Sequence, residues 1–331
     1  MLPVELTLAI AEHTRPDIWP TLSRIPLFHQ TLHHPLFWRS QCHQLGLVGL
    51  TQQKQYREHY ITDRNWRLGR FRRTCRPVDV CLHMDGGRAV STGEAGGWVW
   101  EMESGVRVVD VGTISAAAVD GPTVVGGAKD GLLSVRDVRM RNRVRLSAHQ
   151  DEVSVVALSG TTIISGSMDG TVKLWDLNLN LLDQWTLDSP ISAVAIRRGI
   201  VAIGTVGGTL FHRNETTKLD GGAINCLTIR GSEVICGTDD GVLRGISGKT
   251  HRIIEETYGS PIIALHRHRG RVVAGHADGL ITCHDLRTKK SMFIAERRPL
   301  IWQIYSDDCR IISSSIDQRL LVHDFSTIAH H

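Results

Sequence analysis

SGSMDGTVKLWDL, residues 165–177, is the stretch of sequence that decides the fold. A β-branched or apolar run, the tight turn Asp169-Gly170 and a second alternating run are together typical of a β-hairpin. Six weaker copies have their turns at Gly96-Gly97, Asp130-Gly131, Gly207-Gly208, Asp240-Gly241, Asp278-Gly279 and Asp317-Gln318. The steps between successive turns are 34, 39, 38, 33, 38 and 39 residues. Seven hairpins at such regular spacing predict a repeat architecture.

The composition is that of an ordinary globular protein. The chain has 331 residues, of which 41% are hydrophobic and 22% charged, so it can bury substantial cores. Its apolar runs are far shorter than the roughly 20 residues that span a bilayer, and we expect no membrane association. The net charge of +4 is too small to argue nucleic-acid binding. Seven single cysteines without a Cys-x-x-Cys motif indicate reduced thiols, which favours a cytoplasmic or nuclear location, or both.

The first 46 residues do not share the repeat. Leu2, Leu6 and Ile10 follow one another at a spacing of four, which predicts an amphipathic helix that Pro16 ends. Two further short helical segments follow, the second opened by Pro26. Three short helices form a very small core, so this unit is expected to need a partner for stability.

Residues 1–46 resemble the F-box. The opening Leu2-Pro3-x-Glu5-Leu6-x-x-x-Ile10 and the closing Pro35-Leu36-Phe37-Trp38-Arg39 match that family, at the right separation. The sequence departs from the family at Pro26 and at His13-Thr14; the alternative is an unrelated small helical hairpin. The resemblance implies a Skp-type adaptor, and through it a cullin, as partners. The residues implied in adaptor binding are Leu2, Pro3, Leu6, Ile10, Leu36, Phe37 and Trp38.

The rest of the chain is similar to F-box/WD-repeat proteins. Residues 47–65 are expected to be a helical connector, and Asn65-Trp66-Arg67-Leu68-Gly69-Arg70 looks like the segment that joins an F-box to a propeller. The resemblance therefore implies an all-β seven-bladed WD-repeat β-propeller over residues 66–331, preceded by a small all-α F-box. The sequence stops soon after the predicted strand 319–325, which leaves blade seven short of its outer strand. We expect residues 66–76 to supply that strand and close the ring.

The conspicuous polar residues are interpreted as structural. In WD repeats a turn carboxylate, a hydroxyl, an imidazole and an indole N–H form one buried network, and here they are His149, Ser165, Asp169 and Trp175. The other blades have lost parts of it: Arg136, Ile246, His284 and His323 stand where blade three has tryptophan. The group His266, His268, His276 and His284 is only a weak zinc pattern. We expect no catalytic residue, metal or cofactor.

Two arginine-rich runs, 64–76 and 136–145, allow two interpretations. They are either a nuclear signal or patch for acidic partners, or charged edge strands that discourage aggregation, and the second interpretation is favoured. No aromatic residues interleave with these arginines to suggest base stacking, so nucleic-acid binding is not expected.

The central face of the propeller is the expected site for a protein substrate. One ring of positions is the second residue of each inner strand: Asp79, Ser115, Ser154, Ser192, Asn225, Ile263 and Trp302. The other is the residue before each turn pair: Ala95, Lys129, Met168, Val206, Asp239, Ala277 and Ile316. The best-known F-box/WD-repeat receptors place arginines at several such positions to bind phosphorylated segments. Here none is arginine and only Lys129 is basic, so phosphate is not expected to be the main recognition element.

Blades six and seven instead offer an apolar sector of Ile263, Ala277, Trp302 and Ile316. The candidate substrate-binding residues are Lys129, Met168, Asn225, Asp239, Ile263, Trp302 and Ile316. Trp302 is the candidate anchor; alternatively its ring packs into the channel or against a loop.

The function that the resemblance implies is the substrate-recognition subunit of an SCF (Skp-cullin-F-box) ubiquitin ligase, which is not itself catalytic. Because the F-box begins at residue 2, with no dimerising segment before it, a monomer within the complex is expected. The identity of the protein substrate does not follow from the sequence. The alternatives are a WD-repeat scaffold unconnected with ubiquitin and an enzyme. The sequence has no nucleophile–base pair or phosphate-binding glycine loop that would favour the enzyme.

Overall fold

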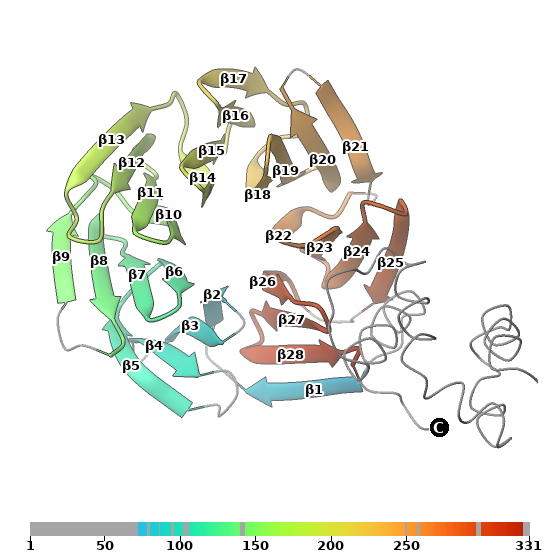
Figure 1. The fold of residues 1–331 in the computed structure, drawn as a ribbon, viewed down its shortest axis with the longest axis horizontal. Coiled ribbons are helices and arrows are strands. Elements are labelled where there is room, and N and C mark those ends of the chain that lie inside the picture. The colour runs from blue at the N-terminus through green and yellow to red at the C-terminus, as the bar shows by residue number, and fades with distance from the viewer. Residues whose placement is uncertain are drawn as a thin grey trace, which may run out of the picture. The chain divides into compact units, whose positions relative to one another are not determined.

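The computed structural model describes residues 72–77, 80–85, 87–93, 96–101, 106–139, 143–248, 250–256, 259–295 and 299–326. They form seven four-stranded antiparallel sheets, the blades of a propeller arranged in a ring (Figure 1). The predicted seven-bladed all-β propeller is therefore confirmed. The predicted F-box (1–46) and connector (47–65) lie outside the described residues.

We number the blades 1 to 7 in chain order and name the strands of each a, b, c and d from the centre of the ring outward. Blade 1 is β2 (Val80–Met84), β3 (Arg88–Gly93), β4 (Gly96–Glu101) and β5 (Val106–Gly112). Blade 2 is β6 (Ala116–Asp120), β7 (Thr123–Gly127), β8 (Leu132–Asp137) and β9 (Arg143–Ser147). Blade 3 is β10 (Val153–Ser159), β11 (Thr162–Ser167), β12 (Thr171–Trp175) and β13 (Leu181–Thr186).

The remaining blades repeat the same path. Blade 4 is β14 (Ile191–Arg197), β15 (Ile200–Thr205), β16 (Thr209–His212) and β17 (Glu215–Lys218). Blade 5 is β18 (Ile224–Arg230), β19 (Glu233–Thr238), β20 (Val242–Ser247) and β21 (Thr250–Glu256). Blade 6 is β22 (Ile262–His268), β23 (Arg271–His276), β24 (Leu280–Asp285) and β25 (Lys290–Ala295). Blade 7 is β26 (Ile301–Ser306), β27 (Arg310–Ser315), β28 (Arg319–Asp324) and, outermost, β1 (Arg72–Pro77).

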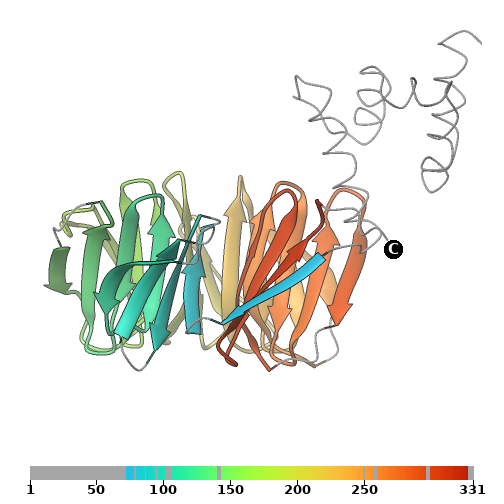
Figure 2. The ribbon, with the colours of Figure 1, turned by 90° about the horizontal axis from the view of Figure 1, so that it is seen from below.

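Blade 7 thus combines strands from distant parts of the sequence. Its sheet has the order β1-β28-β27-β26, so a strand that precedes blade 1 in the chain lies at the outer edge of the last blade (Figure 2). Residues 66–71 of the segment expected at this edge lie outside the described part. A strand shared in this way joins the first and last blades without an open junction.

The path of each blade defines two faces of the propeller. Because the four strands of a blade are antiparallel, the a–b and c–d turns lie at one end of the sheet and the b–c turn at the other. We call the first the c–d face and the second the b–c face. The connections between blades, and therefore the starts of the inner strands, also belong to the b–c face.

The blades pack against one another through glycine. The inner-strand residue Ile191 of blade 4 lies over Gly166 of blade 3, where an added Cβ would come within 2.5 Å of the isoleucine Cγ2. The same close approach joins Gly275 of blade 6 to Ile301 of blade 7, again at 2.5 Å. Both isoleucines are fully buried. Glycine is required at these positions because any side chain would push the neighbouring blade away.

Within the described residues no helix is long and apolar enough to cross a membrane.

Candidate interaction face of the propeller

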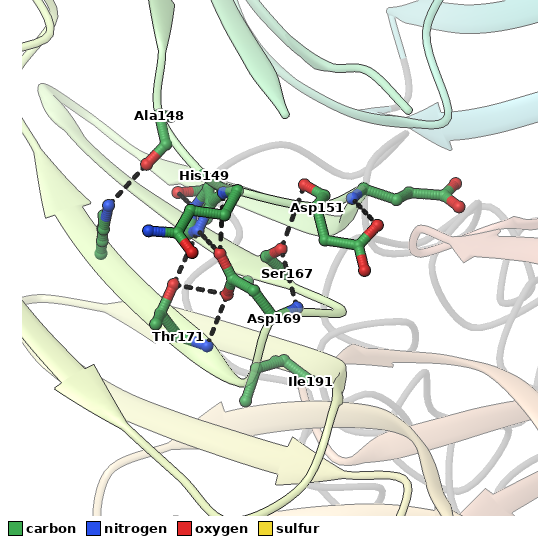
Figure 3. A network of polar contacts seen from close by, with 12 residues as sticks. Ala148, His149, Asp151, Ser167, Asp169, Thr171 and Ile191 are labelled. Atoms are coloured by element: carbon green, nitrogen blue, oxygen red, sulfur yellow. Dashed lines mark hydrogen bonds and ion pairs between the residues drawn. The ribbon is translucent and has the colours of Figure 1, made fainter. Parts of the chain in front are cut away.

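Blade 3 contains a continuous polar network. His149, in the loop before β10, lies with its Nε2 atom 2.7 Å from Ser165 Oγ, and the Trp175 indole N–H donates to the same oxygen at 2.9 Å. On its other side the His149 Nδ1 atom lies 2.8 Å from Thr171 Oγ1 (Figure 3). The Thr171 hydroxyl donates to Asp169 Oδ1 at 2.6 Å. The structure therefore brings the four predicted residues together.

The proton positions of this network follow from what each group can donate. An indole N–H can only donate, so the Ser165 hydroxyl accepts from Trp175 and gives its own hydrogen to His149 Nε2. The other imidazole nitrogen then carries the hydrogen and donates to Thr171, whose hydroxyl donates to the Asp169 carboxylate. This arrangement requires a neutral imidazole. Burial lowers the pKa of His149, although nearby Asp169 opposes the shift, and the neutral form is favoured.

Thr171 is the member of the network that sequence reasoning missed. The ring of His149 and the carboxylate of Asp169 are 3.5 Å apart at their nearest nitrogen and oxygen, and Thr171 bridges them through its hydroxyl. Its backbone N–H also donates to Asp169 Oδ1 at 2.8 Å. A threonine two residues after a turn aspartate is the sequence signal that could have found it. Burial raises the pKa of Asp169, but the hydrogen bonds from Thr171 and Gln150 have the larger combined effect and lower the pKa to below its usual range.

The other blades either keep part of this network or form different bonds at the same positions. Blade 1 keeps the indole–hydroxyl pair, since Trp100 Nε1–H donates to Ser91 Oγ at 2.6 Å. In blade 5 the turn carboxylate of Asp240 is held instead by Arg244, through Nη2–Oδ2 and Nη1–Oδ1 distances of 2.6 and 3.0 Å. These bonds stabilise the charge of both groups: the pKa of Arg244 is raised and that of Asp240 is lowered despite its burial.

Blade 6 has His284 where blade 3 has Trp175, and His276 where blade 3 has Ser167. Thr282 Oγ1 lies 3.0 Å from His276 Nε2 and 2.9 Å from His284 Nε2. The second ring nitrogen of His284 lies 2.9 Å from Ser291 Oγ, and the Ser291 hydroxyl donates to Glu255 of blade 5 at 2.7 Å. Burial lowers the pKa of His284 to about 4, although Glu255 opposes the shift. These contacts give the two histidines a structural role, and no group that could hold a metal ion occurs among the described residues.

At the start of the inner strands, serine hydroxyls join neighbouring blades. Ser154 is the extra residue of a β-bulge in β10, and its hydroxyl donates to the carbonyl oxygen of Ile191 in blade 4 at 2.5 Å. Ser192 has the same bulge position in β14 and donates to Ile224 of blade 5 at 2.7 Å. Ser115, just before β6, donates to Val153 of blade 3 at 3.1 Å. These candidate face positions therefore belong to the blade–blade contacts.

The same bulge position carries different residues in blades 5 to 7. Asn225 donates to the Asp239 carboxylate at 2.8 Å, so two of the predicted face residues are bonded to each other. In blades 6 and 7 the bulge residues are Ile263 and Trp302, whose side chains cannot form the serine contact. Ile263 is half-buried, whereas Trp302 is 40% exposed. Trp302 is thus a large apolar side chain on the b–c face at a position that elsewhere makes a polar blade–blade bond.

The residues before the b–c turns form a second ring on this face. In blades 3 and 7 the backbone N–H groups of Met168 and Ile316 donate to the carbonyls of Glu152 and Leu300, which fixes the turn and leaves the side chains outward. Met168 and Ile316 are 41% and 50% exposed, and Lys129 is exposed as well.

Exposed apolar residues are not confined to blades 6 and 7. Val206 of blade 4 is 46% exposed and Met168 of blade 3 is 41% exposed. Ala277 of blade 6, by contrast, is half-buried. The expected apolar sector of blades 6 and 7 is therefore incomplete as a description of this face. Val206 was part of the ring considered from the sequence but not of the candidate set.

The second arginine run has contacts between blades. Arg136 and Arg143 of blade 2 donate to the carbonyl oxygens of Asp110 and Val111 in blade 1, at 2.6 and 2.7 Å. This part of the run therefore holds two blades together, a role that neither sequence interpretation included. The predicted adaptor-binding residues lie outside the described residues.

Comparisons with known proteins agree with this geometry. Residues 141–176, which include the hairpin and network of blade 3, match the model of the family WD domain, G-beta repeat (WD40). The chain is similar to the crystal structure of the computationally designed Ika8 protein, with 25% identity, a TM-score of 0.63 and coverage of 74% of this chain and 83% of that chain. It is also similar to the WD40 β-propeller domain of Doa1, with 16% identity, a TM-score of 0.64 and coverage of 75% and 92%. No curated protein matches the sequence.

The fold is thus a seven-bladed WD40-type propeller. Propellers of this type are protein-interaction scaffolds and are typically non-catalytic, which implies protein partners in general.

Proposed function

We propose that this protein is the substrate-recognition subunit of an SCF ubiquitin ligase. In this proposal residues 1–46 are an F-box that docks a Skp-type adaptor, and the b–c face of the propeller binds the protein to be ubiquitinated. The observation that carries the substrate-binding half is the 40% exposed indole of Trp302, at a bulge position that the serines of other blades use for internal bonds. The adaptor-binding half is supported by the F-box resemblance of the sequence.

The mechanism would be positioning. The propeller would hold its target near an enzyme charged with ubiquitin, and the raised effective concentration of the target would accelerate transfer. The residues proposed to contact the target are Lys129, Met168, Asn225, Asp239, Ile263, Trp302 and Ile316. None is arginine, so we expect apolar rather than phosphate recognition.

Co-purification with a Skp-type adaptor tests the proposal. The full chain, co-expressed with the adaptor, is expected to form a stable complex that Leu6→Asp abolishes and Leu6→Met preserves. Leu182→Asp is the matched control, because Leu182 is a 56% exposed leucine on the outer strand β13 of the propeller. Failure of the wild-type chain to bind the adaptor would overturn the proposal and favour a WD40 scaffold unconnected with ubiquitin.

A further inference from the structure

The c–d face, opposite the face considered above, is more positively charged in blades 4 to 6 than in blades 1 to 3. In blades 1 to 3 the described a–b and c–d turns include five acidic residues, Asp85, Glu101, Asp120, Asp137 and Asp176. They also include three arginines: Arg139, which is exposed, and Arg88 and Arg143, which donate to backbone carbonyls. In blades 4 to 6 the corresponding turns include eight exposed cations, two of which are Arg269 and Arg287. We call the other six the basic sector: Arg197, Arg198, Arg213, Arg230, Lys289 and Lys290. Because every a–b and c–d turn lies at the same end of its blade, these cations share one face of the propeller.

The cations of the basic sector form no ion pair within the described residues. Within the described part of the chain, none of the six forms a hydrogen bond or ion pair through its side chain. These turns include three acidic residues. Glu215 is exposed and forms no ion pair with the sector, and the other two are engaged with other groups. Glu233 is held by Arg252 and Arg267 at 2.5 and 2.8 Å, and Asp285 accepts the backbone N–H groups of Arg287 and Thr288. The sector is therefore a positively charged surface that the fold itself leaves unneutralised.

The backbone gives an independent indication that these cations are not there for the fold. Arg198, Arg213 and Lys289 have φ values of 51°, 52° and 55°, in the left-handed region that favours glycine. At the position of Arg198 in the a–b turn, blades 3 and 5 have Gly160 and Gly231, with φ values of 61° and 63°. Blade 6 has Arg269 at this position, with a φ of 51°. Blades 4 and 6 thus have an arginine where blades 3 and 5 have the unstrained residue. Strained residues that persist in this way are concentrated at functional sites.

The chemistry of the sector selects the kind of partner. Four of its six cations are arginines, whose planar guanidinium groups bind carboxylates in a two-pronged arrangement. The described residues of these turns include no aromatic side chain on which nucleic-acid bases could stack. They also lack the exposed bulky apolar residues with which a protein inserts into a lipid surface. We propose that the basic sector is a docking surface for an acidic polypeptide segment rich in Asp and Glu, separate from the b–c face.

Binding of a synthetic peptide by the full chain tests this proposal. A fluorescent ten-residue peptide of alternating Asp and Glu is expected to bind at low salt and to be released at about 0.5 M salt, where screening is nearly complete. The double variant Arg198→Gly/Arg213→Gly is expected to lower affinity about tenfold, since each exposed pair lost costs about threefold. Its melting temperature is expected to stay the same or rise, because glycine relaxes both turns. Arg145→Gly, an exposed arginine on the outer strand β9, is the control and should leave affinity unchanged.

The remaining outcomes decide the proposal in one direction or the other. Absence of peptide binding at low salt, or unchanged affinity in the double variant, overturns it. Tighter binding of single-stranded DNA or of phosphatidylserine vesicles than of the peptide overturns it as well, in favour of those partners. If the double variant is destabilised, Arg230→Glu decides: a loss of affinity at an unchanged melting temperature supports the sector, and retained affinity overturns it. Peptide binding that survives Trp302→Ala shows that the two faces are separate; its loss in that variant would overturn the assignment to the c–d face.

Discussion

Blades 3 and 7 use the same backbone position for different purposes. In blade 3 the bulge residue Ser154 turns its hydroxyl toward the carbonyl of Ile191 and ties two blades together. In blade 7 the bulge residue Trp302 makes no such bond and presents a large ring that is 40% exposed. The difference shows that the propeller can do without this bond at some junctions. A side chain freed from that structural duty is available for binding a partner.

The largest effect on stability is expected for His149→Ala, which disrupts the polar network of blade 3. The substitution removes the buried imidazole between Ser165 and Thr171, so the Ser165 hydroxyl loses its acceptor and the Thr171 oxygen loses its donor, while their bonds to Trp175 and Asp169 remain. We expect the free energy of unfolding to fall by about 3 kcal/mol, measured by urea denaturation. His251→Ala, at an exposed histidine on β21, should change it by less than about 0.5 kcal/mol. Equal stability of the two variants would contradict a stabilising network.

Trp302→Ala tests whether the exposed bulge residue of blade 7 serves for binding and not for stability. Because the side chain is partly exposed and makes no blade–blade hydrogen bond, we expect a stability loss of about 1 kcal/mol or less. If the b–c face binds the target, capture of that target should fall about 30-fold, which corresponds to roughly 2 kcal/mol. Quantitative pull-down with a proteasome inhibitor present measures this. Unchanged capture by a folded variant would remove Trp302 from the proposed site.

Because blade 6 contains buried histidines, we expect the stability of the protein to fall in acid. The indole of Trp175 in blade 3 does not titrate and has no such effect. Burial lowers the pKa of both His284 and His266 to about 4, well below the usual value of 6.5. The folded state therefore binds fewer protons than the unfolded chain, so stability is fully present above pH 6.5 and is lost as the pH falls toward 4. Each histidine should contribute on the order of 1–2 kcal/mol of this loss at pH 5. Urea denaturation at pH 7 and pH 5 measures the loss, and His284→Gln should reduce it; a variant with the wild-type pH dependence would contradict the prediction.

The smallest effect is expected for Ser154→Ala. The substitution removes one hydroxyl donor from the Ile191 carbonyl and should destabilise the protein by about 1 kcal/mol. Val108→Ala, at a 45% exposed valine on β5, is a surface control of similar size with an expected change below about 0.5 kcal/mol. If Ser154→Ala were as stable as wild type, the serine contacts would be a consequence of blade packing and not a cause of it.

The repeat could be predicted from sequence because the hairpin turns are local. The Asp-Gly and Gly-Gly pairs mark the turn directly, and the spacing of turns gives the number of blades. The network of His149, Ser165, Asp169 and Trp175 was accessible for the same reason, since its members have fixed offsets from one turn. Thr171 was missed because a hydroxyl next to a turn aspartate is easily interpreted as part of the turn alone.

Contacts between blades could not be predicted in the same way. The bond from Ser154 joins residues 37 apart in sequence, and its partner is a backbone carbonyl that has no sequence signature. Whether Trp302 is buried or exposed likewise depends on how blade 7 packs, which no local pattern reports. The net charge of +4 does not reveal that the c–d face is more positive in blades 4 to 6 than in blades 1 to 3. This difference arises only when folding brings the turns of successive blades to one face.

The placement of β1 in blade 7 also constrains the order of folding. The strand Arg72–Pro77 pairs in a sheet whose neighbouring strand, Arg319–Asp324, lies about 240 residues later in the chain. During synthesis β1 therefore leaves the ribosome long before its partner exists, and it waits while the intervening blades form. Completion of the ring is a late, long-range event. A chain that stalls before residue 319 would carry an unpaired strand at one end of the ring and an open blade at the other, a form that chaperones and quality control can recognise.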